Sequence, residues 1–427
     1  MTTIADKRTN RRLSLHGLGV ICGLTAAVWL GAAEAPTKLV TAGFSPFAIS
    51  LAMVCGVFLS RWTFPTLLKG TAYVFADLAD KKHLIIWALL AGVLWAEGNT
   101  LTVFAVRDVG LSVAFPLWNA NSLIGLLWGR VLFCELKGAT RGNIAKVVFG
   151  AVAIAFAAAM IGFSTVRGGV GHHAMRGVIA AIGAAFTFGT MYVPYRKAYL
   201  SGMNPLSFVT AFTVGELATV LSLTFALDHG THSSAIRLFH QPGLLFWLFL
   251  GGCVWVVGDL FQQFAAKYVG IGRGIPLSNT NQLWGLAWGA LVFGELAGAG
   301  RDRMLFVIGG SVVMILGALA ISTAVASEQE QRATNEVVMR ECDRYDLDLK
   351  KVTLSQQGDE LDRGAGVKHW WDYAIVVVST GIFVWLGVRA VIPPLQMNLH
   401  WLGGLVGILL LALALGAYCL GKRTHFE

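Results

Sequence analysis

Apolar runs of about 20 residues alternate with short polar segments along almost the whole chain. A helix needs about 20 residues to cross the roughly 30 Å hydrocarbon core of a bilayer, and it satisfies its own backbone hydrogen bonds there. The pattern therefore predicts an all-α, polytopic membrane protein with twelve spanning helices. We place them at residues 13–33, 46–66, 84–105, 110–134, 143–164, 175–195, 205–227, 243–265, 270–294, 304–325, 373–392 and 400–420.

One stretch of this pattern occurs twice. Residues 111–138 and 271–298 align without a gap at an offset of 160, and 13 of the 28 positions are identical. The first ten spans therefore divide into two five-helix repeats, at 13–164 and 175–325. Because five is odd, the second repeat must enter the membrane from the opposite side to the first, which is the inverted-repeat plan of secondary transporters.

The other segments flank or follow the repeats. They are an N-terminal tail (1–12), a charged linker (326–372), a two-helix hairpin (373–420) without a counterpart in the repeat, and a short tail (421–427). The composition also indicates a membrane protein, with 56% hydrophobic and 13% charged residues and a mean hydropathy of +0.65.

The net charge of +9 reports topology rather than nucleic-acid binding. With the N-terminus inside, 25 of the 33 Lys and Arg residues fall on the inner side, as the positive-inside rule expects. We expect a protein of the cytoplasmic (inner) membrane with both termini in the cytoplasm, the lipid bilayer as a partner, and no nucleic-acid partner.

The repeated stretch carries the candidate substrate site. Pro116 and Pro276 fall inside apolar spans, where each removes a helical hydrogen bond, and a matched pair of interrupted helices points to a transporter binding site. Amide and indole groups near them suit a polyhydroxylated solute, because amides bond to hydroxyls and an indole covers a C–H face. The alternative is helix packing, since each stretch also contains a Gly-x-x-x-Gly pattern. The substrate-binding candidates are Trp118, Asn119, Asn121, Trp128, Asn279, Asn281, Gln282, Trp284 and Trp288.

Three carboxyl groups fall within apolar spans, namely Glu97, Glu216 and Asp259. Ionisable groups in a membrane are expensive and are functional candidates by default. Asp259 occupies the position that Asn99 has in the other repeat, so the symmetry is broken at an ionisable site. We therefore predict coupling to protons or Na⁺, with Glu97 ranked first because it lies nearest the middle of its span. The alternative for each group is a neutral carboxylic acid that hydrogen bonds to a neighbouring helix.

Other kinds of chemistry are not indicated. The six cysteines have neither metal-site nor disulfide spacing, and no catalytic or nucleotide-binding motif occurs, so we expect no cofactor, no metal and no enzymatic activity. Asp346-Leu347-Asp348 in the linker looks like a metal-binding acidic pair, but a chance match in an acidic stretch is the better interpretation. Glu135 and Glu295, at the ends of their spans, are expected to pair with Arg or Lys.

The motif resembles that of a known group of transporters. A proline in the fourth helix of each repeat with a glutamate at its end, here Pro116 with Glu135 and Pro276 with Glu295, is similar to the recurring pattern of the drug/metabolite transporter (DMT) superfamily. With its asparagines and Trp-Gly pair, the region 13–325 is most similar to the glucose/ribose porter (GRP) branch of sugar transporters. The resemblance implies ten helices in two inverted five-helix repeats and a sugar as substrate.

Together these features predict a secondary transporter that moves a monosaccharide or related polyol by alternating access. Two alternatives stay open. One is export of a metabolite or nucleotide sugar, which would favour a strongly basic cavity, and the other is a membrane-embedded enzyme or a non-transporting sensor. A homodimer is among the open oligomeric states, and the sequence names neither the sugar nor the direction of transport.

Overall fold

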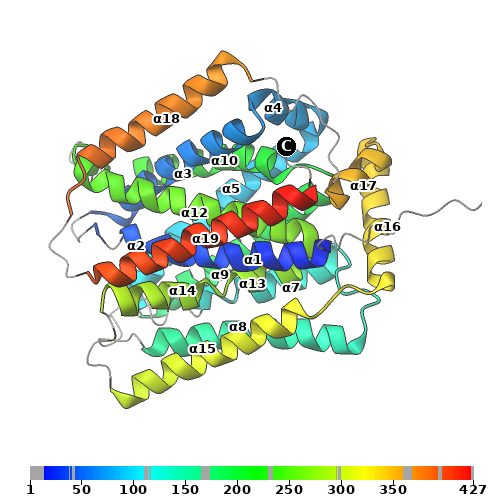
Figure 1. Ribbon diagram of the computed structural model, residues 1–427, viewed down its shortest axis with the longest axis horizontal. Coiled ribbons are helices and arrows are strands. Elements are labelled where there is room, and N and C mark those ends of the chain that lie inside the picture. The colour runs from blue at the N-terminus through cyan, green and yellow to red at the C-terminus, as the bar shows by residue number, and fades with distance from the viewer. Residues whose placement is uncertain are drawn as a thin grey trace, which may run out of the picture.

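The chain folds into a bundle of helices that run side by side (Figure 1). The structure is a computed structural model, and it describes residues 14–37, 39–40, 44–109, 114, 117–164, 174–228, 234–294, 296, 300–358, 368–392 and 397–424. Within these ranges every regular element is helical, which confirms the all-α prediction.

The helices follow the predicted order. The first half contains α1 (Leu15–Ala32), α2 (Glu34–Thr37), α3 (Pro46–Leu68), α4 (Thr71–Asp80), the 3₁₀ helix η1 (Lys82–Leu84), α5 (Ile85–Val109), α7 (Asn121–Leu132) and α8 (Arg141–Ser164). The second half contains α9 (Ala174–Leu200), α10 (Pro205–Leu227), α11 (Ser234–Phe239), α12 (Pro242–Val269), α13 (Ile271–Ser278), α14 (Asn281–Ala287), the π-helical turn η2 (Trp288–Val292) and α15 (Arg301–Ser322). The linker forms α16 (Glu328–Tyr345) and α17 (Leu349–Gln357), and the chain continues with α18 (Trp370–Val388) and α19 (Leu399–Thr424).

Corresponding helices of the two halves begin in the same way. The Ser45 hydroxyl accepts a hydrogen bond from the backbone N–H of Ala48 at the start of α3, and the Asn204 side chain accepts one from Leu206 at the start of α10. A proline follows the capping residue in both helices. Capping oxygens satisfy N–H groups that the helix leaves unpaired, and a proline in the first turn costs no hydrogen bond.

Ten helices of the described chain are long and apolar enough to cross a membrane. They correspond to ten of the twelve predicted spans. The two exceptions are the predicted spans 110–134 and 270–294, which are the two copies of the repeated stretch. The predicted count of twelve spans is therefore not confirmed.

Both copies of the repeated stretch contain a break at the same position. In the second copy α13 ends and a turn at Asn279 and Thr280 separates it from α14; in the first copy a turn at Asn119 and Ala120 precedes α7. Pro276 lies inside α13, close before its break, whereas Pro116 lies outside the described residues. In both copies the break lies next to the asparagines that the repeat shares, Asn119 and Asn121 in the first and Asn279 and Asn281 in the second.

Equivalent helices of the two halves make reciprocal contacts. At an offset of about 160 residues α1 corresponds to α9, α3 to α10, α5 to α12 and α7 to α14. α1 packs against α12 and α9 against α5; α3 packs against α12 and α10 against α5; α14 packs against α1 and α7 against α9. α8 packs against its own counterpart α15. Exchanging the two halves therefore turns each contact into another contact that the structure also contains.

Two glycines mark corresponding helix crossings. A side chain placed on Gly92 of α5 would overlap the carbonyl oxygen of Phe212 in α10, and one placed on Gly252 of α12 would overlap the carbonyl oxygen of Met53 in α3. Small residues allow helix backbones to approach this closely in a membrane. Each crossing joins a helix of one half to a helix of the other.

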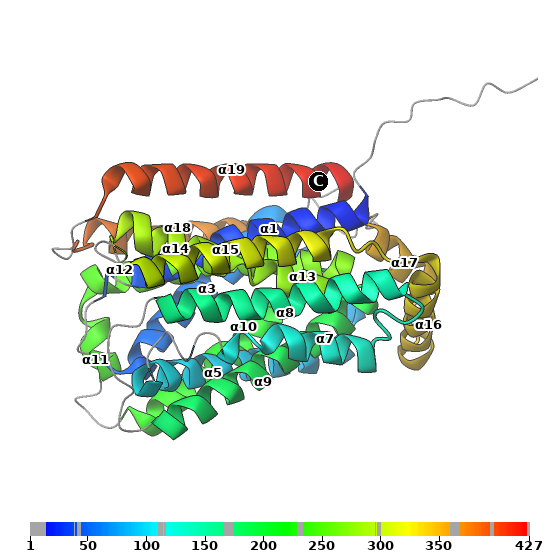
Figure 2. The ribbon, with the colours of Figure 1, turned by 90° about the horizontal axis from the view of Figure 1, so that it is seen from below.

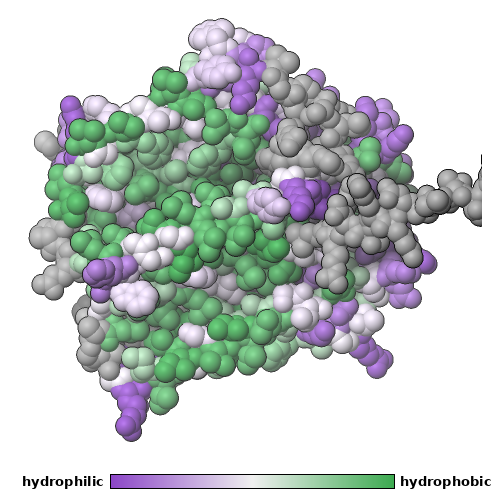
Figure 3. Space-filling model, viewed as in Figure 1, coloured by the Kyte–Doolittle hydropathy of each residue, from purple (hydrophilic) through white to green (hydrophobic). Residues whose placement is uncertain are grey.

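α16 and α17 cover one end of the bundle, and α11 lies at the opposite end (Figure 2). The His16 ring contacts the carbonyl oxygen of Ser322 at 2.7 Å, and Thr424 lies beside Gly358. The first and last helices therefore have their chain ends on the side of the linker. Between the two ends of the bundle, apolar residues cover the middle of the face in Figure 3, with hydrophilic residues towards its edges, which suits a bilayer.

Candidate substrate site and buried charge cluster

The breaks in the two repeated stretches meet inside the bundle. The Nδ2 group of Asn279, in the turn between α13 and α14, donates a hydrogen bond of 2.9 Å to Oδ1 of Asn121, the first residue of α7. Both side chains are 7% exposed. An amide pair in an apolar bundle needs such a partner, because an unpaired buried amide is costly. Two of the predicted substrate-binding residues, one from each half, are therefore in direct contact.

The neighbouring polar candidates lie around this contact. Asn119 is buried in the turn before α7, and Gln282 is buried at the start of α14. The Nε2 group of Gln282 donates to Oδ1 of the half-buried Asn281 at 3.0 Å. The amides of both broken helices are thus gathered near the contact between the halves.

The four predicted tryptophans do not form one surface. The Trp128 indole donates to the Thr190 hydroxyl of α9 at 3.2 Å. Trp118 packs in a separate apolar cluster with Ala105 and Ala181, whereas Trp284 and Trp288 pack with residues of α1 and α19. Only Trp128 lies on the same helix as Asn121, so it is the indole best placed to join that asparagine in a site.

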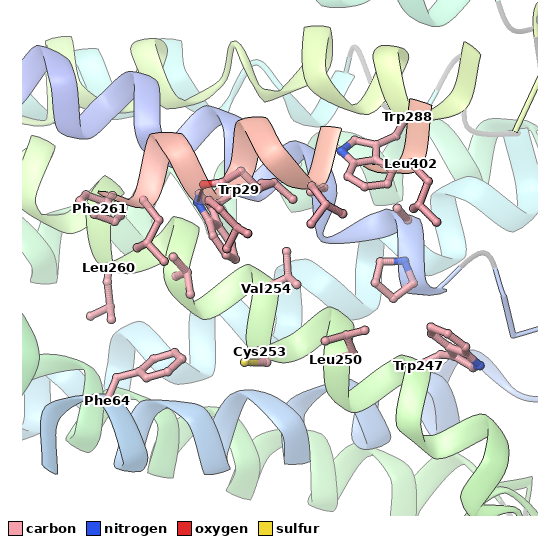
Figure 4. A pocket seen from close by; sticks show the side chains of 18 of the residues that line it. Trp29, Phe64, Trp247, Leu250, Cys253, Val254, Leu260, Phe261, Trp288 and Leu402 are labelled. Carbon is pink, nitrogen blue, oxygen red and sulfur yellow. Dashed lines mark hydrogen bonds between the residues drawn. The ribbon is translucent and has the colours of Figure 1, made fainter. Parts of the chain in front are cut away.

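A cavity of about 880 Å³ lies between α19 and the bundle, against α1 and α12 (Figure 4). Its lining includes Trp29, Val254, Leu402 and the predicted substrate residue Trp288, and it is almost wholly apolar. A polyhydroxylated solute would lose its hydrogen bonds to water there without replacement. This cavity is therefore not the site that the asparagines indicate.

A cluster of three charged side chains lies in the middle of the bundle. Arg61 of α3 forms ion pairs with Glu216 of α10 at 2.7 Å and with Asp259 of α12 at 2.6 Å, and all three side chains are 0% exposed. Asp259 also accepts hydrogen bonds from Gln263 at 2.7 Å and from the Tyr195 hydroxyl at 3.5 Å. Two of the three predicted coupling residues are thus brought together by an arginine.

Aromatic rings enclose this cluster. The Arg61 guanidinium carbon lies 4.1 Å from the centroid of the Phe212 ring and 4.9 Å from that of Trp255. Rings stabilise a cation that faces them, and this interaction is stronger where water is absent. The Tyr199 hydroxyl of α9 donates to Gln263, which in turn donates to Asp259. The charge cluster is therefore held by α3, α9, α10 and α12 together.

The third predicted coupling residue lies elsewhere. Glu97 is exposed on α5, and the structure does not bring it to the cluster of Arg61, Glu216 and Asp259. Its central place in the apolar run indicated depth along the helix, but the run does not specify which face of α5 points inward. Ranking by depth alone therefore placed Glu97 above the two carboxylates that the bundle buries.

A second charged cluster closes the end of the bundle that α16 covers. Glu135, after α7, accepts hydrogen bonds from the backbone N–H groups of Ile271 at 3.1 Å and Gly272 at 2.9 Å, at the start of α13, and forms an ion pair of 2.9 Å with Arg196. A carboxylate at a helix N-terminus is stabilised by the unpaired N–H groups and the helix dipole. The predicted pairing of Glu135 with a basic residue is confirmed, while Glu295 lies outside the described residues.

The linker takes part in this closure. Glu330 of α16 accepts hydrogen bonds from the Arg273 guanidinium at 2.7 and 2.9 Å and from the backbone N–H of Leu136 at 3.2 Å. Leu136 has a φ of 62°, in the left-handed region that costs a non-glycine residue roughly 1–2 kcal/mol. We name Glu135, Arg196, Arg273 and Glu330 the end clamp, because together they join the end of α7 to the start of α13.

Arg61, Arg273 and Glu330 were not among the predicted functional residues. Arg61 did carry a signal, because it is a cation near the end of the apolar run 46–66. No feature of the sequence distinguished Glu330 from the other charged residues of the linker, because its role depends on how α16 packs over the end of the bundle.

Comparisons with known proteins point to one activity. Residues 179–342 match a family model described as sugar transport protein. A Listeria monocytogenes protein assigned to sugar uptake is 24% identical over 256 residues, which cover 59% of this chain and 83% of the relative. A Staphylococcus epidermidis protein assigned to glucose uptake, GlcU, is 22% identical over 244 residues, which cover 57% of this chain and 79% of the relative. These matches support a sugar transporter.

Further matches are of the same kind. A Streptococcus pyogenes protein assigned to sugar uptake is 24% identical over 274 residues, covering 61% of this chain and 86% of the relative. The family and these relatives are transporters rather than enzymes, in agreement with the expected class of this membrane protein. A solved structure, titled only as the crystal structure of a protein, is 15% identical with a TM-score of 0.46 and covers 70% of this chain and 97% of the other.

Proposed function

We propose that this chain is a secondary transporter that moves a monosaccharide or related polyol across the cytoplasmic membrane by alternating access. The observation that carries the proposal is the hydrogen bond between Asn279 and Asn121, which joins the matched breaks of the two halves inside the bundle. Broken helices that meet near the bilayer midplane are where secondary transporters bind their substrates.

The chemistry of this contact suits a sugar. In the present state the Asn279 amide group donates to the Asn121 carbonyl oxygen, so the contact is closed. A sugar hydroxyl can both donate and accept, so it can replace the amide partner on each side without leaving either asparagine unpaired. Binding between the two halves would then exchange one inter-half hydrogen bond for two bonds to the solute.

The reciprocal packing of the halves supports alternating access. If the two five-helix repeats are inverted, exchanging their conformations turns a state open to one side into a state open to the other. The contacts α1 with α12 and α9 with α5 are such an exchangeable pair. In this proposal two further spans are interrupted helices. One consists of α7 and the residues before it, and the other of α13, α14 and η2, so that the protein has twelve spans in total.

The end clamp then acts as the closed gate on one side. Opening that end requires the end of α7 to leave the start of α13, so the bonds of Glu135 to Ile271 and Gly272 must break. The linker and both chain ends lie at this end, and we assign it to the cytoplasm because of the excess of Lys and Arg predicted there.

A counterflow experiment tests the proposal. Purified protein in proteoliposomes loaded with an unlabelled solute is diluted into labelled solute, with a panel of monosaccharides, polyols and nucleotide sugars. We expect transient accumulation of at least one labelled monosaccharide or polyol. Counterflow of nucleotide sugars alone would favour the exporter alternative, and binding without any counterflow, measured by thermal shift, would favour a sensor.

A further inference from the structure

The central cluster has one more carboxylate than guanidinium. Glu216, Asp259 and Arg61 are each 0% exposed, so water does not compensate their charges. With both carboxylates ionised, the cluster would carry one unbalanced negative charge inside an apolar bundle. Such a charge is unfavourable even after relaxation of the protein. A single proton on one of the carboxylates removes the imbalance.

The hydrogen bonds indicate which carboxylate takes the proton. Asp259 accepts from three donors, the Arg61 guanidinium, the Gln263 amide and the Tyr195 hydroxyl, and such donors stabilise the ionised form. The Thr213 hydroxyl lies beside Glu216, one turn earlier on α10, and Glu216 accepts a hydrogen bond from Arg61 through Oε2 at 2.7 Å. Its other oxygen, Oε1, is buried and has no hydrogen-bond partner among the described residues. The proton therefore belongs on Oε1 of Glu216.

We propose that Glu216 binds one exchangeable proton, with Arg61 as its fixed counter-ion, and that this proton is the coupling ion of transport. The second part rests on the proposed sugar transport, whereas the first part can be measured without it. The step adds one proton to a carboxylate to give a carboxylic acid, and release to the opposite side reverses it.

The surroundings of Glu216 favour a proton over a metal ion. Arg61 from α3 lies between the two carboxylates, in the position that a bound Na⁺ would need. The other titratable groups that face the cluster are Asp259 from α12 and Tyr195 and Tyr199 from α9. On α5, Gly92 lies against the backbone of α10 at Glu216. A charged metal would have to displace a guanidinium, whereas a proton fits the existing geometry.

A row of aromatic rings connects the cluster to the asparagine contact. Tyr192 of α9 lies against Gly125 of α7, one turn after Asn121. The Tyr192 ring is 5.8 Å from the Tyr195 ring, in an edge-to-face arrangement, and Tyr195 donates to Asp259. A sugar on the helix face of Asn121 and Gly125 would therefore contact Tyr192. Displacement of Tyr192 would reach Asp259 through Tyr195.

The test compares three proteins, namely the wild type, Glu216→Gln and the control Glu97→Gln. Proteoliposomes are assayed for counterflow and, separately, for sugar accumulation driven by an imposed pH gradient or Na⁺ gradient. We expect the wild type and Glu97→Gln to accumulate sugar with the pH gradient only. Glu216→Gln imitates the protonated state, so it should keep counterflow and lose at least tenfold of the gradient-driven accumulation.

The possible results separate this inference from the proposed function. No counterflow in the wild type would overturn the proposed function. Normal wild-type counterflow together with pH-driven accumulation by Glu216→Gln, or accumulation that needs Na⁺, would overturn the coupling proposal. If Glu216→Gln does not fold, infrared spectra of the wild type and of the conservative variant Glu216→Asp decide. A carboxylic acid C=O band at neutral pH that shifts in Glu216→Asp and is unchanged in Glu97→Gln supports the proton on Glu216. A wild type without such a band, or a band that Glu216→Asp leaves unchanged, contradicts it.

Discussion

Two groups of buried charges lie in different parts of the bundle, one in its middle and one at the end that α16 covers. The end clamp contains two carboxylates and two guanidinium groups, so its charges balance. Each oxygen of Glu135 and Glu330 accepts at least one hydrogen bond, several of them from backbone N–H groups. The central cluster contains two carboxylates and one guanidinium group, and Oε1 of Glu216 has no hydrogen-bond partner within the part of the chain that the structure describes.

The comparison shows how a charge cluster with a structural role can be distinguished from one that binds and releases a proton. Both clusters are buried and both have short ion pairs, so distance and burial do not distinguish them. Charge balance and the bonding of each carboxylate oxygen do, because carboxylates that are balanced by cations and bonded at every oxygen gain nothing from a proton. We therefore assign the end clamp to gating and the central cluster to coupling.

The largest effect is expected from removing the central cation. Arg61→Leu leaves Glu216 and Asp259 without their counter-ion in the bundle and should lower the free energy of unfolding by about 3–5 kcal/mol. Thermal denaturation in detergent, followed by tryptophan fluorescence, measures this effect. Arg332→Leu is the control, because Arg332 is 77% exposed and its ion pair with Glu328 should contribute less than about 1 kcal/mol. Equal melting temperatures of the two variants would contradict the claim that Arg61 balances the charge of the central cluster.

A smaller effect is expected at the end clamp. Glu330→Gln removes the charge opposite Arg273 and should weaken the closed end by about 1.5–3 kcal/mol, the usual contribution of hydrogen bonds to charged groups. Amide hydrogen exchange at the start of α13 should then become at least tenfold faster. The exposed neighbour Glu328 on the same helix provides the control variant Glu328→Gln. Unchanged exchange in Glu330→Gln would show that α16 does not hold the gate.

The fold was predictable where one apolar run corresponds to one helix. Ten of the predicted spans have this property, and the run lengths placed them well. The broken helices were anticipated from Pro276 and its counterpart, but the break lies at Asn279 and Thr280, where no single residue type demands it. Hydropathy averages over a span, so it does not resolve an interruption of two residues between apolar segments.

The candidate site was predictable only in part. The repeat singled out Asn121 and Asn279, but the pairing of one residue with the other requires the crossing of the two halves. Glu216 and Asp259 were chosen because they are carboxyl groups within apolar spans. The role of Arg61 could be recognised only from the packing of α3, α10 and α12, which places it between them. The face that a helix turns inward is set by tertiary packing, and a sequence with apolar residues all round does not reveal it.

The most direct test of the substrate site is the affinity for the monosaccharide that gives the strongest counterflow, measured by titration calorimetry in detergent. If Asn279 and Asn121 bond to the sugar, Asn279→Ala should weaken binding by roughly 5- to 150-fold, which corresponds to the loss of about 1–3 kcal/mol. The control Asn335→Ala alters an exposed amide on α16 and should bind as the wild type does. Unchanged affinity in a folded Asn279→Ala protein would contradict the proposal that the two halves hold the sugar between their broken helices.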